Sequence, residues 1–201
     1  MPIFLLIRHG ETDYVDEVLA GRIDAPLTEF GRRQAQHLAE VLGQKPIRAI
    51  YSSPMCRAVE TAQPLAEALH LFVEMDPTLT QVDFGEWQGL SFDELTKRED
   101  WQAFKKDPSS VRCPGGEHMS AVRHRVMLGL QRIASGYEND DLLGVFAHGS
   151  IIRSAIAFFL DMPLEAMNRL TIGTASVSAL QVSDHRVRLL QLNQVFPPTI
   201  A

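Results

Sequence analysis

Near the N-terminus, the apolar residues Ile3 to Ile7 are followed at once by the polar sequence Arg8-His9-Gly10. An uninterrupted apolar run of this length predicts a β-strand that is buried on both faces, as in the sheet of an α/β protein. Open α/β sheets bind ligands at the carboxyl ends of their strands, so Arg8 and His9 are predicted to stand at such a position. Arg8 suits forked contact with phosphate or carboxylate, and His9 can act as base, nucleophile or ligand. Taken alone, the tripeptide is equally compatible with a strand end that carries two solvated polar residues.

The rest of the chain alternates predicted strands and helices, recognised by short apolar runs and by apolar residues at helical spacing. Further strands are predicted at 49–51, 71–74, 142–147, 177–182 and 187–192, with a turn at 184–186 between the last two. Helices are predicted after the N-cap Thr28, from Ser53-Pro54 to about Leu69, from near Ser91, across Val122–Ile133 and across Ile151–Phe159. This alternation predicts an α/β fold, a three-layer α/β/α sandwich whose sheet is mostly parallel with an antiparallel edge.

The length of 201 residues allows one substantial core or at most two small domains. Residues 77–115 are less regular than the rest and lack enough apolar residues for a core of their own. We therefore expect a single domain over residues 1–201, with 77–115 as a cap or insertion over the sheet.

Charge and composition exclude several classes of function. The net charge of −6 argues against general nucleic-acid affinity, which needs a basic face, but it permits a local basic pocket for a small anion. No segment has the length of a membrane span or the pattern of a signal peptide. Cys56 and Cys113 show no metal-binding spacing and are expected to be reduced structural thiols. The expected location is cytoplasmic, without membrane or nucleic-acid partners; the oligomeric state is not predicted.

Two apolar strands end in the same way, the first at Arg8-His9-Gly10 and the second at His148-Gly149. If the strands are neighbours, both histidines point into one crevice, which Arg57 at the start of a helix can join. Two histidines and two or more arginines beside helix N-termini suit a tetrahedral anion. Zinc would want a third ligand at recognisable spacing, and the chain lacks the common nucleotide-binding and serine-hydrolase motifs.

On these motifs the chain resembles the histidine phosphatase (phosphoglycerate-mutase-like) superfamily over nearly its whole length. The matching segments are Arg8-His9-Gly10-Glu11-Thr12, 21–31, 52–62, 84–89, Gly116-Glu117 and Ala147-His148-Gly149. The resemblance implies a metal-independent phosphomonoesterase without a cofactor, acting on small phosphate monoesters.

The resemblance also implies roles for individual residues. His9 matches the nucleophile, which attacks phosphorus in line and becomes a phosphohistidine, while Arg8, Arg57 and His148 match the phosphate pocket. His9 must be neutral to attack, and nearby arginines disfavour its protonated form. The residues expected to bind substrate are Thr12, Gly21, Arg22, Gln81 and Gly149.

Two positions depart from the family pattern. Gln81 stands where the family usually has a glutamate that serves as general acid, and an amide cannot protonate a leaving alkoxide. Asp83 and Glu86 are the nearest carboxylates that can substitute, and are otherwise solvated loop acids. Val15 replaces an asparagine that helps bind phosphate in many members. Both changes point to a narrowed substrate range, a good leaving group or reduced activity.

Two alternative functions stay open at this point. One is a cofactor-dependent phosphoglycerate mutase, although such enzymes are usually longer. The other is a phosphate-ester-binding protein whose catalysis has weakened, an alternative that Gln81 favours. Arg22 and Arg153 either touch substrate or are structural, Trp87 and Trp101 are expected to pack within the cap, and Glu117 is a candidate anchor behind the site. The sequence does not identify the physiological substrate.

Overall fold

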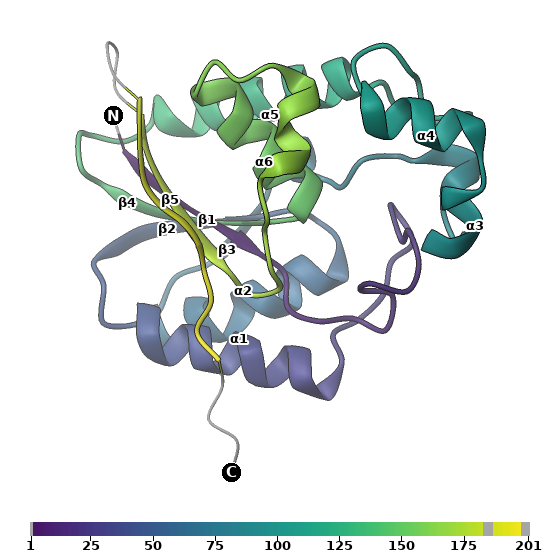
Figure 1. The fold of residues 1–201 in the computed structure, drawn as a ribbon. Helices are drawn as coiled ribbons and strands as arrows, with labels where there is room; N and C mark the ends of the chain where they lie inside the picture. Colours follow the sequence, from purple (N-terminus) through teal and green to yellow (C-terminus); the bar gives the residue numbers. More distant parts are fainter. Residues whose placement is uncertain (1, 183–186, 198–201) are drawn as a thin grey trace.

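The computed structural model describes residues 2–182 and 187–197, whose centre is a six-stranded sheet in the order β3-β2-β4-β1-β5-β6 (Figure 1). The strands are β1 (Ile3–Arg8), β2 (Ile47–Ser52), β3 (Val73–Met75), β4 (Leu142–Ala147), β5 (Val177–Val182) and β6 (Val187–Gln194). Strands β1 to β4 are parallel to one another, and β5 and β6 are antiparallel to their neighbours. The predicted parallel sheet with an antiparallel edge is confirmed.

Helices cover both faces of the sheet, which confirms the three layers (Figure 1). One face carries α1 (Glu29–Leu42) and α2 (Cys56–Leu69), and the other carries α5 (Met119–Ala134) and α6 (Gly149–Phe159). Successive side chains of β1 point to opposite faces, so they join two different apolar clusters. Leu5 and Ile7 pack with the α1–α2 layer, whereas Phe4 and Leu6 pack with the α5–α6 layer. None of the described helices is long and apolar enough to cross a bilayer.

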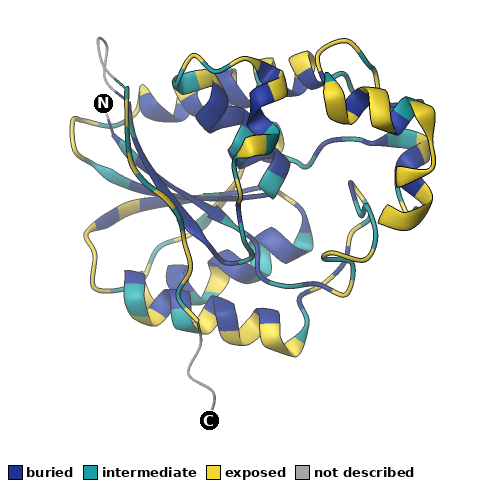
Figure 2. Ribbon diagram, in the orientation of Figure 1, coloured by how far each residue is buried: buried dark blue, intermediate teal, exposed yellow. Residues whose placement is uncertain are grey.

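The segment 77–115 lies at the carboxyl end of the parallel strands and contains four short helices. These are η1 (Pro77–Leu79), η2 (Gly85–Trp87), α3 (Phe92–Thr96) and α4 (Glu99–Lys106); a further 3₁₀ helix, η3 (Leu164–Arg169), follows α6. Trp87 packs edge-on against Trp101 with a centroid distance of 5.2 Å, and both belong to the apolar cluster of the α5–α6 layer. The outward faces of α3 and α4 are exposed (Figure 2). That this segment is a cap rather than a second domain stays a prediction, which the shared core supports.

Several element boundaries differ from the sequence-based predictions for physical reasons. Helix α2 begins at Cys56 instead of Pro54, because the Ser53 N–H still donates to the Phe146 carbonyl at the end of the sheet. Strand β3 begins at Val73 instead of Leu71, because His70 adopts a left-handed conformation and the Leu71 N–H donates back to Ala66. The predicted turn at 184–186 lies outside the described residues. Helix α4 lacks a predicted counterpart.

The loop after β1 is held by contacts with α2 and with the start of α1. The Gly10 N–H donates to Thr61 Oγ1 of α2 at 2.9 Å, and the N–H of Thr28, the N-cap of α1, donates to the Glu11 carbonyl at 3.0 Å. A Cβ on Gly31 would overlap the Glu11 carbonyl oxygen, and one on Gly10 would lie 2.7 Å from the Gly31 oxygen. Glycine at these two positions therefore lets the residues after His9 lie directly on α1.

We predict that Gly31→Ala lowers the free energy of unfolding by about 1–3 kcal/mol, because the added methyl group meets rigid backbone. Gly136→Ala is the matched control, since its Cβ would meet the nearest atom at an ordinary 3.6 Å; its unfolding free energy should change by less than about 1 kcal/mol. Urea denaturation measures both values. Equal effects of the two substitutions would contradict the proposed contact.

Candidate active site

The two histidines predicted to share a crevice lie close together, because β1 and β4 are adjacent and in register, but of the two only His9 lines the cavity described below. Arg8 is paired with Ala147, and the His9 N–H donates to the Ala147 carbonyl at 3.0 Å. The imidazole rings of His9 and His148 consequently lie with their centroids 5.2 Å apart. Both rings stand at the carboxyl end of the parallel strands, where α/β sheets bind their ligands.

His9 is fixed in one tautomer by its own loop. Its Nδ1 lies 2.7 Å from the Gly10 carbonyl oxygen, which can only accept, so Nδ1 carries the hydrogen and Nε2 keeps its lone pair. The side chain is buried, and burial lowers its pKa well below 6.5, with the charges of Arg8 and Arg57 acting in the same direction. His9 is therefore a neutral imidazole with a free Nε2, which is the state that a nucleophile needs.

His148 is fully buried and has the opposite tautomer. Arg57 Nε donates to its Nδ1 at 3.3 Å, so the hydrogen is on Nε2, which donates to Ser53 Oγ at 2.8 Å. Burial lowers its pKa well below 6.5, and the neighbouring His9 and the arginines add to this. His148 also occupies the N-cap position of α6. The N–H of His148 is thus held by Ser53, and its other ring nitrogen positions Arg57.

Two arginines bring positive charge to these rings. Arg57 is buried, and its guanidinium donates to the carbonyls of Ile23 and Gly21, each at 2.8 Å. Arg8 Nη1 donates to the Ile172 carbonyl at 2.6 Å, while its buried Nε has no hydrogen-bond partner among the described residues. Burial, followed by the charge of Arg153, lowers the pKa of Arg8 to about 10. In the part of the chain that the structure describes, neither arginine forms an ion pair with a carboxylate.

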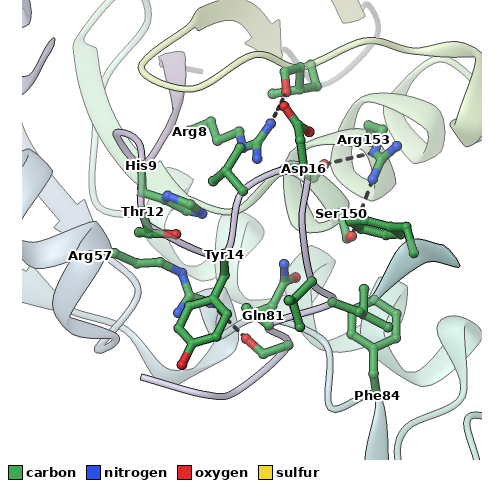
Figure 3. A pocket seen from close by; sticks show the side chains of 18 of the residues that line it. Arg8, His9, Thr12, Tyr14, Asp16, Arg57, Gln81, Phe84, Ser150 and Arg153 are labelled. Atoms are coloured by element: carbon green, nitrogen blue, oxygen red, sulfur yellow. Dashed lines mark hydrogen bonds between the residues drawn. The ribbon is translucent and has the colours of Figure 1, made fainter. Parts of the chain in front are cut away.

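Arg8, His9 and Arg57 line a cavity of about 330 Å³, whereas the fully buried His148 does not line it (Figure 3). Of the residues expected to bind substrate, Thr12, Gly21, Gln81 and Gly149 line it, whereas Arg22 does not. The other lining residues come from the β1–α1 loop, from the segment 81–92, from α6 and from η3 with the residues that follow it. Arg153, for which the sequence left open contact with substrate or a structural role, lines it too, as does Val15, which stands where many family members have an asparagine. The lining residues that the sequence analysis did not discuss as site residues are Tyr14, Asp16, Val18, Leu19, Ala20, Phe84, Phe92, Ser150, Asn168, Leu170, Thr171 and Ile172.

Gln81 enters the cavity but holds no transferable proton. Its side-chain oxygen accepts the Val82 N–H at 2.9 Å, and its backbone carbonyl accepts from Arg22 Nε at 3.1 Å and from Arg125 Nη2 at 3.3 Å. The amide is therefore a positioned hydrogen-bonding group.

The structure places neither tentative acid in the lining of the cavity. Asp83 accepts the Gly85 N–H at 2.9 Å and lies 3.6 Å from Arg22 Nη1, and Glu86 is exposed. Among the lining residues the acidic side chain is Asp16, which lies on the Arg8 side of the cavity (Figure 3). Asp16 has a φ of 65°, in the left-handed region that few residues adopt. No pattern in the sequence could have placed it there, because the path of this irregular loop has no periodicity.

Glu117 anchors the loop that carries Gln81. Its carboxylate binds Arg125 through both oxygens at 3.0 Å, lies 3.1 Å from Arg22 and accepts the Asp83 N–H at 2.9 Å. Although burial acts to raise it, these hydrogen bonds and charges hold the pKa of Glu117 below its usual value. Arg22 is thus part of this anchor, which accounts for its position outside the cavity.

Comparison with known proteins gives one family. The model of the histidine phosphatase superfamily (branch 1) matches residues 4–195. The chain is 37% identical over 178 residues to "Bifunctional protein Rv2228c" of Mycobacterium tuberculosis, covering 87% of this chain but 48% of that protein. The chain thus spans about half the length of the first mycobacterial relatives it matches.

Other relatives are matched over nearly their full length. "Phosphoserine phosphatase 1" of Hydrogenobacter thermophilus is 29% identical, with 94% of this chain and 90% of that protein covered. The native structure of mycobacterial glucosyl-3-phosphoglycerate phosphatase superposes with a TM-score of 0.85 at 32% identity, covering 95% of this chain and 98% of that one.

We predict that the rings of His9 and His148 are still neutral at about pH 6, although an unperturbed histidine titrates near pH 6.5. A lowered pKa means that the neutral form persists to more acidic pH. Nitrogen-15 NMR of the imidazole rings measures this, and the variants His9→Asn and His148→Asn assign the signals. A midpoint at or above about 6.5 for either ring would show that burial and the arginines do not control it.

Proposed function

The chain belongs to the histidine phosphatase superfamily, and we propose that it hydrolyses small phosphate monoesters through a phosphohistidine on His9. The observation that carries this proposal is the neutral His9 ring, whose Nε2 keeps its lone pair in a cavity with arginines that form no ion pair with a described carboxylate. The names of two relatives, a phosphoserine phosphatase and a glucosyl-3-phosphoglycerate phosphatase, support the same reaction class.

In the first step, the lone pair of His9 Nε2 attacks phosphorus, and the bond from phosphorus to the ester oxygen breaks on the opposite side. Arg8 and Arg57 stabilise the charge on the remaining phosphoryl oxygens, and His148 joins them by exchanging its hydrogen bond with Ser53 Oγ for one with a phosphoryl oxygen. The unpaired Arg8 Nε is a donor already present for such an oxygen. In the second step, water attacks the phosphohistidine, which releases inorganic phosphate and restores His9.

The alkoxide that leaves in the first step needs a proton unless it is a weak base. Gln81 cannot supply it, and Asp83 and Glu86 lie outside the lining of the cavity. We therefore propose Asp16 as the carboxyl group that protonates the leaving group, on the basis of its place in the cavity. The water molecule that attacks the phosphohistidine in the second step gives a proton back to Asp16.

Three further proposals concern nucleic-acid binding, cellular location and the need for a metal or cofactor. The net charge of −6 supports a function that does not involve nucleic acid. A cytoplasmic location is supported by Cys56 and Cys113, both of which are free thiols; burial raises the pKa of Cys113 to about 12, which makes it unreactive. Chemistry without a metal or cofactor is supported by a nucleophile and charge-stabilising groups that all come from the chain itself.

We predict that His9→Ala lowers kcat for an aryl phosphate at least about a thousandfold, because it removes the nucleophile. His37→Ala is the control, since His37 lies on α1 and does not line the cavity. Release of inorganic phosphate measures both, and a chelator added to the wild-type assay should leave the rate unchanged. Comparable activity of the His9 and His37 variants would contradict the proposal.

A comparison of leaving groups tests the proton donor. We predict that Asp16→Asn lowers kcat for an alkyl phosphate at least about tenfold more than for an aryl phosphate, whose leaving group needs little acid help. Asp83→Asn and Glu86→Gln should affect both substrates equally. If either of these variants, and not Asp16→Asn, shows the selective loss, that residue is the acid.

A further inference from the structure

Arg153 brings a third positive charge to the cavity, on the side away from His9 (Figure 3). It lies on α6, and its side chain folds back toward the start of that helix (Figure 3). Its Nε donates to the Gly149 carbonyl at 3.2 Å, and its Nη2 lies 3.4 Å from Ser150 Oγ. Two contacts leave most of its five N–H donors available.

The charge of Arg153 has no counterpart within residues 2–182 and 187–197. It forms no ion pair with a described carboxylate, and the lining residues include three arginines and one acid. Burial lowers the pKa of Arg153 itself. Its charge in turn lowers the pKa of Arg8 and of Lys105, for both of which burial is the larger cause. This side of the cavity therefore carries an excess of positive charge that an anionic group can neutralise.

The surroundings of Arg153 differ from those of the phosphate-binding groups. Besides burial, Arg8 and Arg57 lower the pKa of the two histidines, whereas Arg153 contacts Ser150 and is not a cause of either shift. Asp16 lies between Arg8 and Arg153 in the view of the cavity (Figure 3). The free N–H donors of the Arg153 guanidinium fit the two oxygens of a carboxylate, which it can bind through two parallel hydrogen bonds. A volume of about 330 Å³ has to hold this group together with the phosphoryl group, which favours a small molecule that carries both.

We propose that Arg153 binds a carboxylate of the substrate, so that the preferred substrates are small phosphate esters of hydroxy acids. This inference rests on the proposed phosphatase function. It makes Arg153 a specificity-determining residue: the carboxylate contact orients the ester, and the reaction itself takes place at His9.

The test uses two esters that differ in one group. 3-Phosphoglycerate carries a carboxylate where glycerol 3-phosphate carries a hydroxymethyl group. We expect the wild-type protein to prefer 3-phosphoglycerate by at least about tenfold in kcat/KM, the size of effect expected of a charge-assisted hydrogen bond. Arg153→Gln should bring this preference to about one, and Arg153→Lys should retain part of it, because lysine keeps the charge but lacks the planar fork.

Arg169→Gln is the matched control. It removes the same charge from an exposed residue of η3 that does not line the cavity, so the preference should stay at the wild-type value. Equal losses for both esters in Arg153→Gln would overturn the inference, because a merely structural arginine affects the two alike. A wild-type protein that turns over both esters equally well would overturn it too.

Binding separates this inference from the proposed function. Calorimetry on the His9→Ala variant, which cannot form the phosphohistidine, compares the Kd values of the two esters without turnover. Tighter binding of 3-phosphoglycerate that depends on Arg153 supports the carboxylate site even if the wild-type protein hydrolyses neither ester, a result that would overturn only the phosphatase proposal. Equal Kd values overturn the carboxylate site whatever the activity.

Discussion

The adjacency of two parallel strands, β1 and β4, is the constraint on which the rest of the site depends. Because Arg8 is paired with Ala147, the residues that follow the two strands emerge together at one edge of the sheet. A shift of the register by one residue would reverse the faces of every β1 side chain and separate the two imidazoles. Register is fixed by the apolar clusters on both faces, so the core that stabilises the fold also sets the spacing of the histidines.

The site combines neutral histidines with arginines that form no ion pair with any carboxylate in the described part of the chain. Buried positive charge without a counter-charge opposes folding, whereas it favours the binding of an anion that supplies the missing charge. Burial, aided by the same arginines, lowers the pKa of the imidazoles and keeps them neutral, so one arrangement provides both the charge stabilisation and the protonation state of the nucleophile. Bound phosphate should therefore stabilise the folded protein, and more strongly the tighter it binds.

Periodicity and local motifs were sufficient to predict the sheet, most of the helices and the meeting of His9 with His148. Strand β4 was predicted at its observed limits, because its apolar run is bounded by polar residues on both sides. The start of α2 was predicted two residues early, because a serine–proline pair usually marks the start of a helix. Here Ser53 is still hydrogen-bonded to β4, and the helix begins only at Cys56. Such long-range hydrogen bonds cannot be predicted from the local sequence.

The parts of the site that could not be predicted come from irregular loops. Asp83 and Glu86 were named as tentative acids because they are close to Gln81 in the sequence. In the structure the Asp83 carboxylate accepts the Gly85 N–H and does not line the cavity, and Glu86 is exposed. Asp16 lines the cavity and has a left-handed backbone conformation, which no local sequence pattern predicts. Arg22 was expected to touch substrate, but it binds Glu117 and the Gln81 carbonyl. In each case the tertiary path of the chain, and not residue type, decides the position.

The central claim is that His9 carries the phosphoryl group during the reaction. The most direct measurement is to mix the protein with a phosphorus-32-labelled aryl phosphate, stop the reaction within milliseconds at alkaline pH, and locate the label by mass spectrometry of the peptides. We predict a label on His9 that forms and disappears at rates compatible with turnover, and no labelled peptide in the His9→Ala variant. Turnover without any label on His9, or with a label on another residue, would contradict it.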